Sequence, residues 1–274
     1  MTVTRPSQMV GIFDSGVGGL SVLKAVRAVR KDVCIRYVAD QANVPYGPRP
    51  LEEVRGFASG IAKFLISERA ALVVVACNAA SAAALYSLRE DFPDTPFVGM
   101  EPAVKPAATQ SISGVVGVLA TPATFQGKLY ASVIERFAAN VKVLTSDCPG
   151  LVQRIEQGDL DGPATRSILE QALGPMMDAG ADTIVLGCTH YPFVIPLVQS
   201  IVGTRAKVID PSPAVARQVD KILKENGQPT ETCGETLLFT TGDAGPFDLV
   251  ASSLLGETLP ISSLKWDRSS LLPL

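Results

Sequence analysis

Short apolar runs alternate with longer segments of helical periodicity along the chain. Several of the short runs lack the polar alternation of a strand with one wet face, which is typical of strands buried on both faces of a parallel sheet. The segments predicted as strands are 9–14, 33–40, 71–78, 96–100, 115–121, 141–147, 182–189, 206–211 and 236–243. The segments predicted as helices are 18–30, 50–69, 78–90, 124–138, 163–179 and 211–226. This order predicts an α/β fold with right-handed crossovers.

The chain also contains a weak internal repeat. "VGIFDSGVGGLSVLKAV" and "VGVLATPATFQGKLYASV" both predict a strand, a polar turn and a helix, with Gly11 and Gly117 at corresponding places. Further on, "LVVVACNAAS" aligns with "TIVLGCTHYP", which sets Cys77 opposite Cys188. We therefore expect two similar, mainly parallel-sheet α/β domains related by pseudo-twofold symmetry.

The repeat predicts where the domains and the site lie. We expect a first domain of residues 1–99 plus 211–274 and a second of 100–210, because "AKVIDPSPAVARQV" has the pattern of a crossover back. Ligands of open parallel sheets bind outside the carboxyl ends of the strands, so the site should lie in the cleft between the domains. The residues expected on the two walls are Asp14, Ser15, Cys77 and Asn78, facing Thr121, Cys188, Thr189 and His190.

Composition excludes several classes of protein. Of the 274 residues, 47% are hydrophobic and 19% charged, which suits a folded chain with real cores. The net charge is −3 and no basic stripe stands out, so nucleic acid is not expected as the primary partner. Neither a membrane-length apolar stretch nor a signal-peptide pattern in "MTVTRPSQMVGIFDSG" is found, so we expect a soluble cytoplasmic protein without a membrane partner.

The five cysteines are few and widely spaced, without a C-x-x-C pair. We therefore expect neither a disulfide framework nor a structural zinc site, and no other metal. Cys34 and Cys233 are expected to be small buried apolar residues.

Two cysteines at equivalent strand ends indicate a particular chemistry. Inverting a carbon centre requires a base on one face and an acid on the other, and a thiolate and a thiol can fill both roles. Asp14 could assist Cys77, and His190, the only histidine, could assist Cys188. The alternatives are that Asp14 only forms a turn and that His190 is structural.

The remaining motifs point to a small anionic ligand. "DSGVGG" and "CNAAS" offer backbone donors at helix starts, which suit a carboxylate. "GVGGLS" ends in Ser21 where a dinucleotide motif needs Gly, and there is no P-loop. In "NVPYGPR", Tyr46 could cover a ligand and Gly47 could offer its backbone, although an ordinary surface loop has the same composition.

The segments "GIFDSGVGGLSV", "VPYGPR", "ACNAASA" and "LGCTHYPF" together resemble the signature of bacterial glutamate racemases, within the aspartate/glutamate racemase superfamily. The resemblance spans roughly residues 9 to 247. It implies two α/β domains around a cleft, often in a homodimer, and an enzyme without cofactor that interconverts L- and D-glutamate. D-Glutamate then enters peptidoglycan.

The resemblance also implies roles for single residues. Cys77 and Cys188 match the catalytic cysteines, acting on the D- and the L-enantiomer proton respectively, and Asp14 and His190 match their auxiliary residues. The positions expected to contact substrate are Asp14, Ser15, Tyr46, Gly47, Asn78, Ala79, Thr121, Glu156, Thr189 and His190. The family usually has Thr where this chain has Ala79; the backbone N–H can still donate there, and a lost hydroxyl bond would cost roughly 0.5–1.5 kcal/mol.

Three alternatives remain open from the residues. One is a racemase of another small acidic amino acid such as aspartate. A second is a hydrolase that uses only Cys188 and His190, which leaves the Cys77 half of the repeat unexplained. A third is a non-catalytic amino-acid-binding module.

Overall fold

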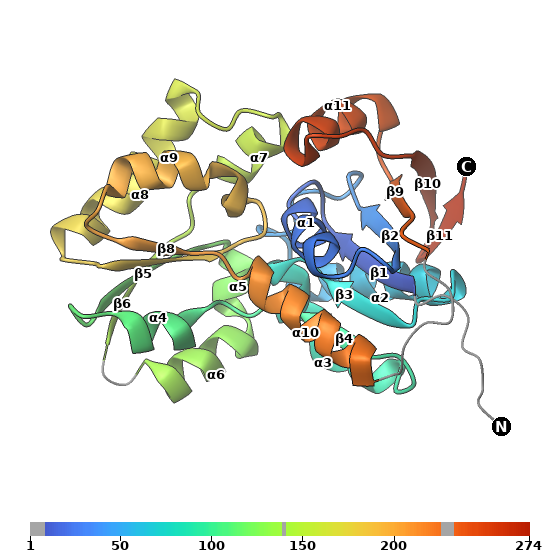
Figure 1. The fold of residues 1–274 in the computed structure, drawn as a ribbon, viewed down its shortest axis with the longest axis horizontal. Helices are drawn as coiled ribbons and strands as arrows, with labels where there is room; N and C mark the ends of the chain where they lie inside the picture. The colour runs from blue at the N-terminus through green and yellow to red at the C-terminus, as the bar shows by residue number, and fades with distance from the viewer. Residues whose placement is uncertain (1–8, 139–140, 226–232) are drawn as a thin grey trace.

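The computed structural model describes residues 9–138, 141–225 and 233–274. Three predictions fall partly outside these residues: the absence of a signal peptide at the amino terminus, the extent of the first domain, and the last residue of the helix predicted over 211–226. Two sheets lie side by side, each with helices against it (Figure 1).

The larger sheet is built from both ends of the chain. Its strands are β1 (Met9–Asp14), β2 (Cys34–Ala39), β3 (Leu72–Val75), β4 (Phe97–Gly99), β9 (Thr236–Thr240), β10 (Ile261–Asp267) and β11 (Ser270–Pro273). Their order is β11-β10-β9-β2-β1-β3-β4, and only the β10–β11 pair is antiparallel. The helices of this half are α1 (Leu20–Val29), α2 (Leu51–Ser67), α3 (Asn78–Asp91), α10 (Ser212–Glu225) and α11 (Ala244–Leu255).

The smaller sheet is formed by the middle of the chain. Its strands β5 (Val115–Ala120), β6 (Lys142–Ser146), β7 (Thr183–Gly187) and β8 (Lys207–Ile209) are parallel in the order β6-β5-β7-β8. Its helices are α4 (Val104–Gln110), α5 (Pro122–Gln126), α6 (Lys128–Phe137), α7 (Leu151–Glu156), α8 (Pro163–Asp178) and α9 (Ile195–Val202), with a 3₁₀ turn η1 at Tyr191–Val194. Figure 1 shows α8 and α9 on one face of this sheet and α4 and α6 on the other.

The predicted α/β class is confirmed, and all nine predicted strands are present. The helix predicted over 124–138 is divided at Gly127, whose backbone is extended and whose Cβ, if added, would lie 2.5 Å from that of Ala82. Helices α4, α7, α9 and α11 and the β10–β11 hairpin were not predicted. "ISSLKWD" has too few apolar positions to be distinguished as a strand, and only its pairing with β9 places it in the sheet.

The internal repeat is visible in the strand order. The segments β2-β1-β3-β4 and β6-β5-β7-β8 have the same order and are all parallel, as a pseudo-twofold repeat requires. The register agrees: Gly11 pairs with Val73, and the equivalent Gly117 pairs with Ile184. Each paired residue precedes a cysteine of the repeat by the same interval along the chain. The boundaries near 99 and 211 remain a prediction.

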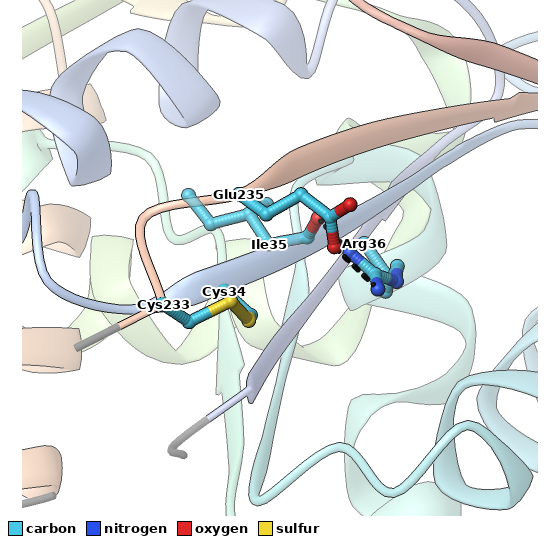
Figure 2. Close-up of a disulfide and its surroundings, with 5 residues drawn as sticks. All are labelled: Cys34, Ile35, Arg36, Cys233 and Glu235. Atoms are coloured by element: carbon cyan, nitrogen blue, oxygen red, sulfur yellow. Dashed lines mark hydrogen bonds and ion pairs between the residues drawn. A yellow bond between two sulfur atoms is a disulfide. The ribbon is translucent and has the colours of Figure 1, made fainter. Parts of the chain in front are cut away.

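Cys34 and Cys233 form a disulfide, so the expectation that they are merely buried apolar residues is wrong. Their Cα atoms lie 5.2 Å apart although 199 residues separate them in sequence. The reason is tertiary: Cys34 begins β2 and Cys233 precedes β9, and these two strands are parallel neighbours. Figure 2 shows the pair at this end of the strands, with Glu235 turned toward Arg36, to which it forms an ion pair of 2.8 Å.

Among the helices described, none combines the length and the apolar character needed to cross a membrane.

Candidate active site

A small cavity of about 20 Å³ lies where the carboxyl ends of the two sheets meet. It brings together loops that follow β1, β2, β3, β5 and β7, the first two residues of α3 and one residue of α7. The lining residues are Ser15, Pro45, Tyr46, Gly47, Cys77, Asn78, Ala79, Thr121, Val152, Cys188, Thr189 and His190.

Ten of these twelve are residues that the sequence analysis selected, and they come from both halves of the repeat. Two selected residues, Asp14 and Glu156, lie behind the wall instead of in it. Pro45 and Val152 were not selected. Pro45 stands inside the quoted loop "NVPYGPR", whereas Val152 belongs to α7 and gives no chemical signal in the sequence.

Cys77 is the N-cap residue of α3. Its backbone is extended, with φ −144° and ψ 122°, and its sulfur accepts a hydrogen bond from the Ala80 N–H at 3.5 Å. The run of alanines after Asn78 lets the first turn of the helix pack closely against its surroundings, since these side chains are nearly all buried. Burial, and then the charge of Asp14, raise the pKa of the Cys77 thiol well above its usual range. In this state Cys77 is a thiol, that is, a proton donor.

Asp14 ends β1 and is completely buried. One of its carboxylate oxygens accepts the Gly19 N–H at 2.5 Å and the Thr189 hydroxyl at 3.3 Å. Burial raises the pKa of Asp14, and the attraction of His190 offsets part of the rise. The charge of Asp14 also raises the pKa of the Cys77 thiol. The carboxyl group therefore acts electrostatically on the thiol of its own half and accepts a hydrogen bond from Thr189 of the other half.

Cys188 follows β7 and lies beside His190. Its sulfur is 3.7 Å from Nδ1 of His190, and both side chains are buried. On the far side of the ring, Nε2 lies 2.5 Å from a carboxylate oxygen of Glu156. Burial alone would lower the pKa of His190, but the hydrogen bonds to Cys188 and Glu156 outweigh it and raise this pKa well above its usual value. A protonated imidazole is thus placed against the sulfur.

Glu156 connects His190 to the opposite half of the molecule. The oxygen that contacts His190 also accepts the Val17 N–H at 2.9 Å, and the other accepts the Gln41 amide at 2.7 Å. Burial would raise the pKa of Glu156, but these bonds, above all that with His190, lower it below its usual value. The carboxylate stays charged and orients the imidazole, which is a positioning role and not contact with the cavity.

Asn78 has both polar side-chain atoms buried without a hydrogen-bond partner among the described residues. Buried amide groups are nearly always paired, because leaving one unpaired costs about 1–3 kcal/mol. Asn78 lines the cavity, so its amide is available to a ligand there. It offers both a donor and an acceptor.

The loop with Tyr46 and Gly47 closes the cavity from the first half. The Gly47 carbonyl accepts the Ala123 N–H of α5 at 3.0 Å, and a Cβ on Gly47 would lie 2.7 Å from the Cβ of Thr121. Only glycine permits this approach to the second half. Ala79 lies in the same wall, and its methyl group leaves no hydroxyl where the resembling family usually has Thr.

A larger cavity of about 560 Å³ lies elsewhere, near the two places where the chain crosses between the sheets. It is lined by residues such as Glu101, Lys105 and Pro211, with no cysteine or histidine among them. Size therefore does not select the candidate site; the two thiols and the imidazole line the small cavity.

One group of side chains among the described residues is close enough together to hold a metal ion: Cys34, Cys233 and Glu235. Its two sulfurs are joined in the disulfide. None of the three residues lines the small cavity.

Comparison with known proteins identifies the class of protein that carries this fold and cavity. The family described as Asp/Glu/hydantoin racemase matches residues 20–219. The protein is therefore a racemase, an enzyme of the isomerase class.

Relatives and solved structures agree over nearly the whole chain. A glutamate racemase from a Roseiflexus species is 51% identical over 246 residues, covering 89% of this chain and 90% of its own. A glutamate racemase isoform from Bacillus anthracis superposes with a TM-score of 0.87 at 30% identity, covering 97% of this chain and 100% of its own. The Francisella tularensis glutamate racemase, solved in complex with D-glutamate, has a TM-score of 0.82 at 29% identity, with 96% and 98% covered.

The chain belongs to the Asp/Glu/hydantoin racemase family, and its resemblance to glutamate racemases, predicted from the four motifs, is confirmed.

Proposed function

We propose that the protein interconverts L- and D-glutamate by direct proton transfer at the α-carbon, with no cofactor. The observation that carries the proposal is the pair of buried thiols, Cys77 and Cys188, which line one cavity from equivalent positions of a repeated fold. The glutamate racemases among its relatives, one of them bound to D-glutamate, support glutamate as the substrate.

The surroundings of the two sulfurs suit opposite protonation states. The imidazolium of His190 favours negative charge on the neighbouring sulfur, whereas Cys77 beside Asp14 favours the thiol. The Cys188 thiolate would remove the α-proton of L-glutamate and leave a carbanion. The Cys77 thiol would then donate its proton to the opposite face, which yields D-glutamate.

The reverse reaction exchanges the two roles. After one turnover Cys77 is a thiolate and Cys188 a thiol, ready to act on D-glutamate. Return to the first state requires that Cys188 lose one proton and Cys77 gain one, and exchange with solvent balances the two; the His190 imidazolium stabilises the Cys188 thiolate, and the charge of Asp14 favours the Cys77 thiol. Each auxiliary residue thus serves the sulfur of its own half.

Substrate contacts are proposed from the remaining wall residues. The unpaired amide of Asn78 and the N–H groups at the start of α3, including that of Ala79, can bind the polar groups of an amino acid. Ser15, Thr121 and Thr189 also line the cavity, and their hydroxyl groups supply the remaining polar contacts to the substrate.

Glutamate is much larger than this cavity, which has room for about one water molecule. The two walls must therefore separate to admit the substrate. Bonds across the cleft, such as Ser21 Oγ donating to the Thr189 carbonyl at 3.0 Å, define the closed state. Closure excludes water, which strengthens electrostatic interactions around the carbanion.

We also propose the cellular setting implied by the family. The protein acts in the cytoplasm, as a homodimer, and supplies D-glutamate for peptidoglycan. The domain boundaries near residues 99 and 211 belong to the same proposal.

The experiment is proton exchange in D₂O with Cys77→Ser and Cys188→Ser tested separately. Each variant removes one of two required proton carriers, so racemisation of glutamate should fall by at least about 10²-fold. The matched control is Cys148→Ser, because burial raises the pKa of this third free thiol to about 12 and it does not line the cavity. Cys148→Ser should racemise glutamate at close to the wild-type rate.

Full racemisation by either cavity variant would exclude the two-thiol mechanism. Turnover of aspartate but not of glutamate would keep the mechanism and change the substrate. Activity that depends on Cys188 and His190 but not on Cys77 would favour the hydrolase alternative, and binding of glutamate without any exchange would favour the binding module.

A further inference from the structure

Asp40, which follows β2, is completely buried but does not line the cavity. A buried carboxylate is costly unless hydrogen bonds compensate it. Four side chains donate to it: Tyr46 through its hydroxyl at 2.6 Å, Asn43 at 3.0 Å, Thr241 at 2.7 Å and Trp266 through its indole N–H at 2.7 Å. We call these five residues the Asp40 cluster.

The direction of the hydrogen bonds within the cluster is well defined. The indole N–H of Trp266 can only donate, and so can the amide group of Asn43 that faces Asp40. The carboxyl oxygens of Asp40 accept all four of these hydrogen bonds. Burial, and then the charge of Asp40, raise the pKa of Tyr46 well above its usual value, so its hydroxyl remains a donor.

The cluster fixes the position of Tyr46 in the wall of the cavity. Tyr46 lines the cavity together with Pro45 and Gly47, and its hydroxyl is anchored by its hydrogen bond to Asp40. Gly47 in turn contacts α5 in the second half through Ala123. A shift of Tyr46 would therefore change the width of the cavity.

The second support of Tyr46 comes from the far end of the chain. Its ring stacks on Phe57 with centroids 5.6 Å apart, and Phe57 contacts Trp266 at 5.8 Å. Trp266 belongs to β10, in the hairpin after residue 260 that the sequence analysis did not predict. Thr241 follows β9, and its hydroxyl also accepts the Ala42 N–H at 3.0 Å. Residues in or next to the carboxyl-terminal strands thus support the loop through Asp40, Phe57 and Ala42.

We propose that Asp40 and Trp266 are positioning residues of the racemase site, holding the Tyr46–Gly47 wall at the distance that glutamate binding requires. The inference rests on the proposed function. Both residues act through Tyr46 and touch no reacting atom.

The test compares steady-state racemisation by wild type, Asp40→Asn and Trp266→Phe. Asp40→Asn keeps the shape but sets an amide N–H₂ against the donors, so KM for glutamate should rise about tenfold. Trp266→Phe keeps an aromatic ring near Phe57 and removes one donor, and KM should rise about threefold. In both, kcat should change less than KM, because the wall binds ground state and transition state alike.

Asp182→Asn is the matched control. This carboxylate also accepts several hydrogen bonds, from Ser111 and from the N–H groups of Ile112 and Ser113, but it lies at the opposite end of β7 from the cavity. The control should leave KM unchanged. Trp266 is the only tryptophan, so its fluorescence reports on the cluster directly: Asp40→Asn should change the emission, and Asp182→Asn should not.

The outcomes separate this inference from the proposed function. A wild-type protein that leaves glutamate unchanged overturns the function and the inference with it. An active wild type with unchanged KM in folded Asp40→Asn and Trp266→Phe overturns the inference alone. If Asp40→Asn does not fold, the inference is tested with Trp266→Phe and Thr241→Val. A KM for glutamate raised about threefold in either variant supports the inference, and a wild-type KM in both variants overturns it.

Discussion

Cys77 and Cys188 are buried to nearly the same extent, at 5% and 6% exposure, but their neighbours differ in charge. Cys77 lies beside a carboxyl group and Cys188 beside an imidazole. At the scale of residues, the proposed mechanism uses this difference to give two chemically identical side chains opposite roles. The repeat provides the equivalent positions, and the residues that break the repeat, Asp14 and His190, provide the asymmetry.

Asn78 gives a prediction about stability and activity together. Its unpaired buried amide destabilises the protein without ligand, so Asn78→Ala should leave the free energy of unfolding within about 1 kcal/mol of wild type. Racemisation should still fall at least about tenfold, because the ligand loses a donor and an acceptor. Chemical denaturation and kinetics on the same sample measure both.

Ser81→Ala is the control for this prediction. Ser81 is equally buried but is paired, donating to the Val75 carbonyl at 3.1 Å and accepting the Met100 N–H at 2.9 Å. It should lose about 1 kcal/mol or more of stability and keep its activity. A ligand-binding role for Asn78 would be contradicted if the Asn78→Ala variant kept full activity and lost as much stability as the Ser81→Ala variant.

The His190–Glu156 pair predicts a pH dependence of stability. The pKa of His190 is raised from about 6.5, so its contribution is complete below pH 6.5 and is lost as pH rises through the raised pKa. The pKa of Glu156 is lowered from about 4.5, so its contribution is present above pH 4.5 and is lost as pH falls through the lowered pKa. Glu156→Gln should therefore destabilise the protein most near pH 5.5, measured by denaturant unfolding across a pH series.

The control is Glu170→Gln, at an exposed ion pair with Arg166 on α8. Such pairs contribute about 0–1 kcal/mol, so the loss should be small at every pH. A loss for Glu156→Gln that does not vary with pH would show that the residue acts by packing and not by charge.

At the scale of elements, the turn from β1 to α1 needs glycine because the second half of the molecule approaches it closely. A Cβ on Gly18 would contact the His190 ring and lie 2.7 Å from a carboxylate oxygen of Asp14. A Cβ on Gly16 would contact the Glu156 carboxylate. The glycines that suggest a ligand loop in the sequence thus allow His190 and Glu156 of the second half to approach this turn closely.

Gly18→Ala should lower racemisation by about 10²-fold, because a displacement of about 1 Å at a catalytic group costs that much. The comparison is Gly56→Ala in α2, where an added Cβ meets no atom within 4 Å. Alanine favours a helix interior over glycine by about 0.5–1 kcal/mol, so Gly56→Ala should raise the melting temperature and keep activity. Wild-type activity in Gly18→Ala would mean that the walls do not close as tightly as the structure has them.

At the scale of the whole molecule, the chain leaves the first sheet, builds the second and returns. β9 adds to β2, and β10 and β11 extend the same sheet. The return brings Cys233 to Cys34 and Trp266 to Asp40. Both contacts tie the end of the chain to the half that carries Cys77.

The disulfide predicts a redox-dependent stability. Removing a cross-link that closes a long loop costs about 2–4 kcal/mol, so Cys34→Ser/Cys233→Ser should lose that much free energy of unfolding. Activity should persist, since neither sulfur lines the cavity. A reductant should destabilise wild type but not the double variant, and unfolded wild type without reductant should titrate as three free thiols. A titration of five free thiols would contradict the Cys34–Cys233 disulfide. In a reducing cytoplasm Cys34 and Cys233 would be kept as free thiols.

The sequence by itself determined the α/β class, the repeat and most of the cavity wall. These depend on local patterns: strands buried on both faces leave continuous apolar runs, and reactive side chains follow directly after them. It could not show that Val152 lines the cavity, or that Asp14 and Glu156 lie behind the lining residues. Whether a side chain reaches the cavity surface depends on how the two halves pack.

Only the tertiary structure decided the contacts between distant segments. The β2–β9 pairing brings Cys34 and Cys233 together, and β10 carries Trp266 to Asp40, although nothing near either residue in the sequence marks its partner. Likewise "LGCTHYPF" and "ACNAAS" each show one thiol, whereas the single cavity between them exists only once the two sheets close on each other. The physical reason is that a site made of opposed groups requires long-range packing, which local periodicity does not encode.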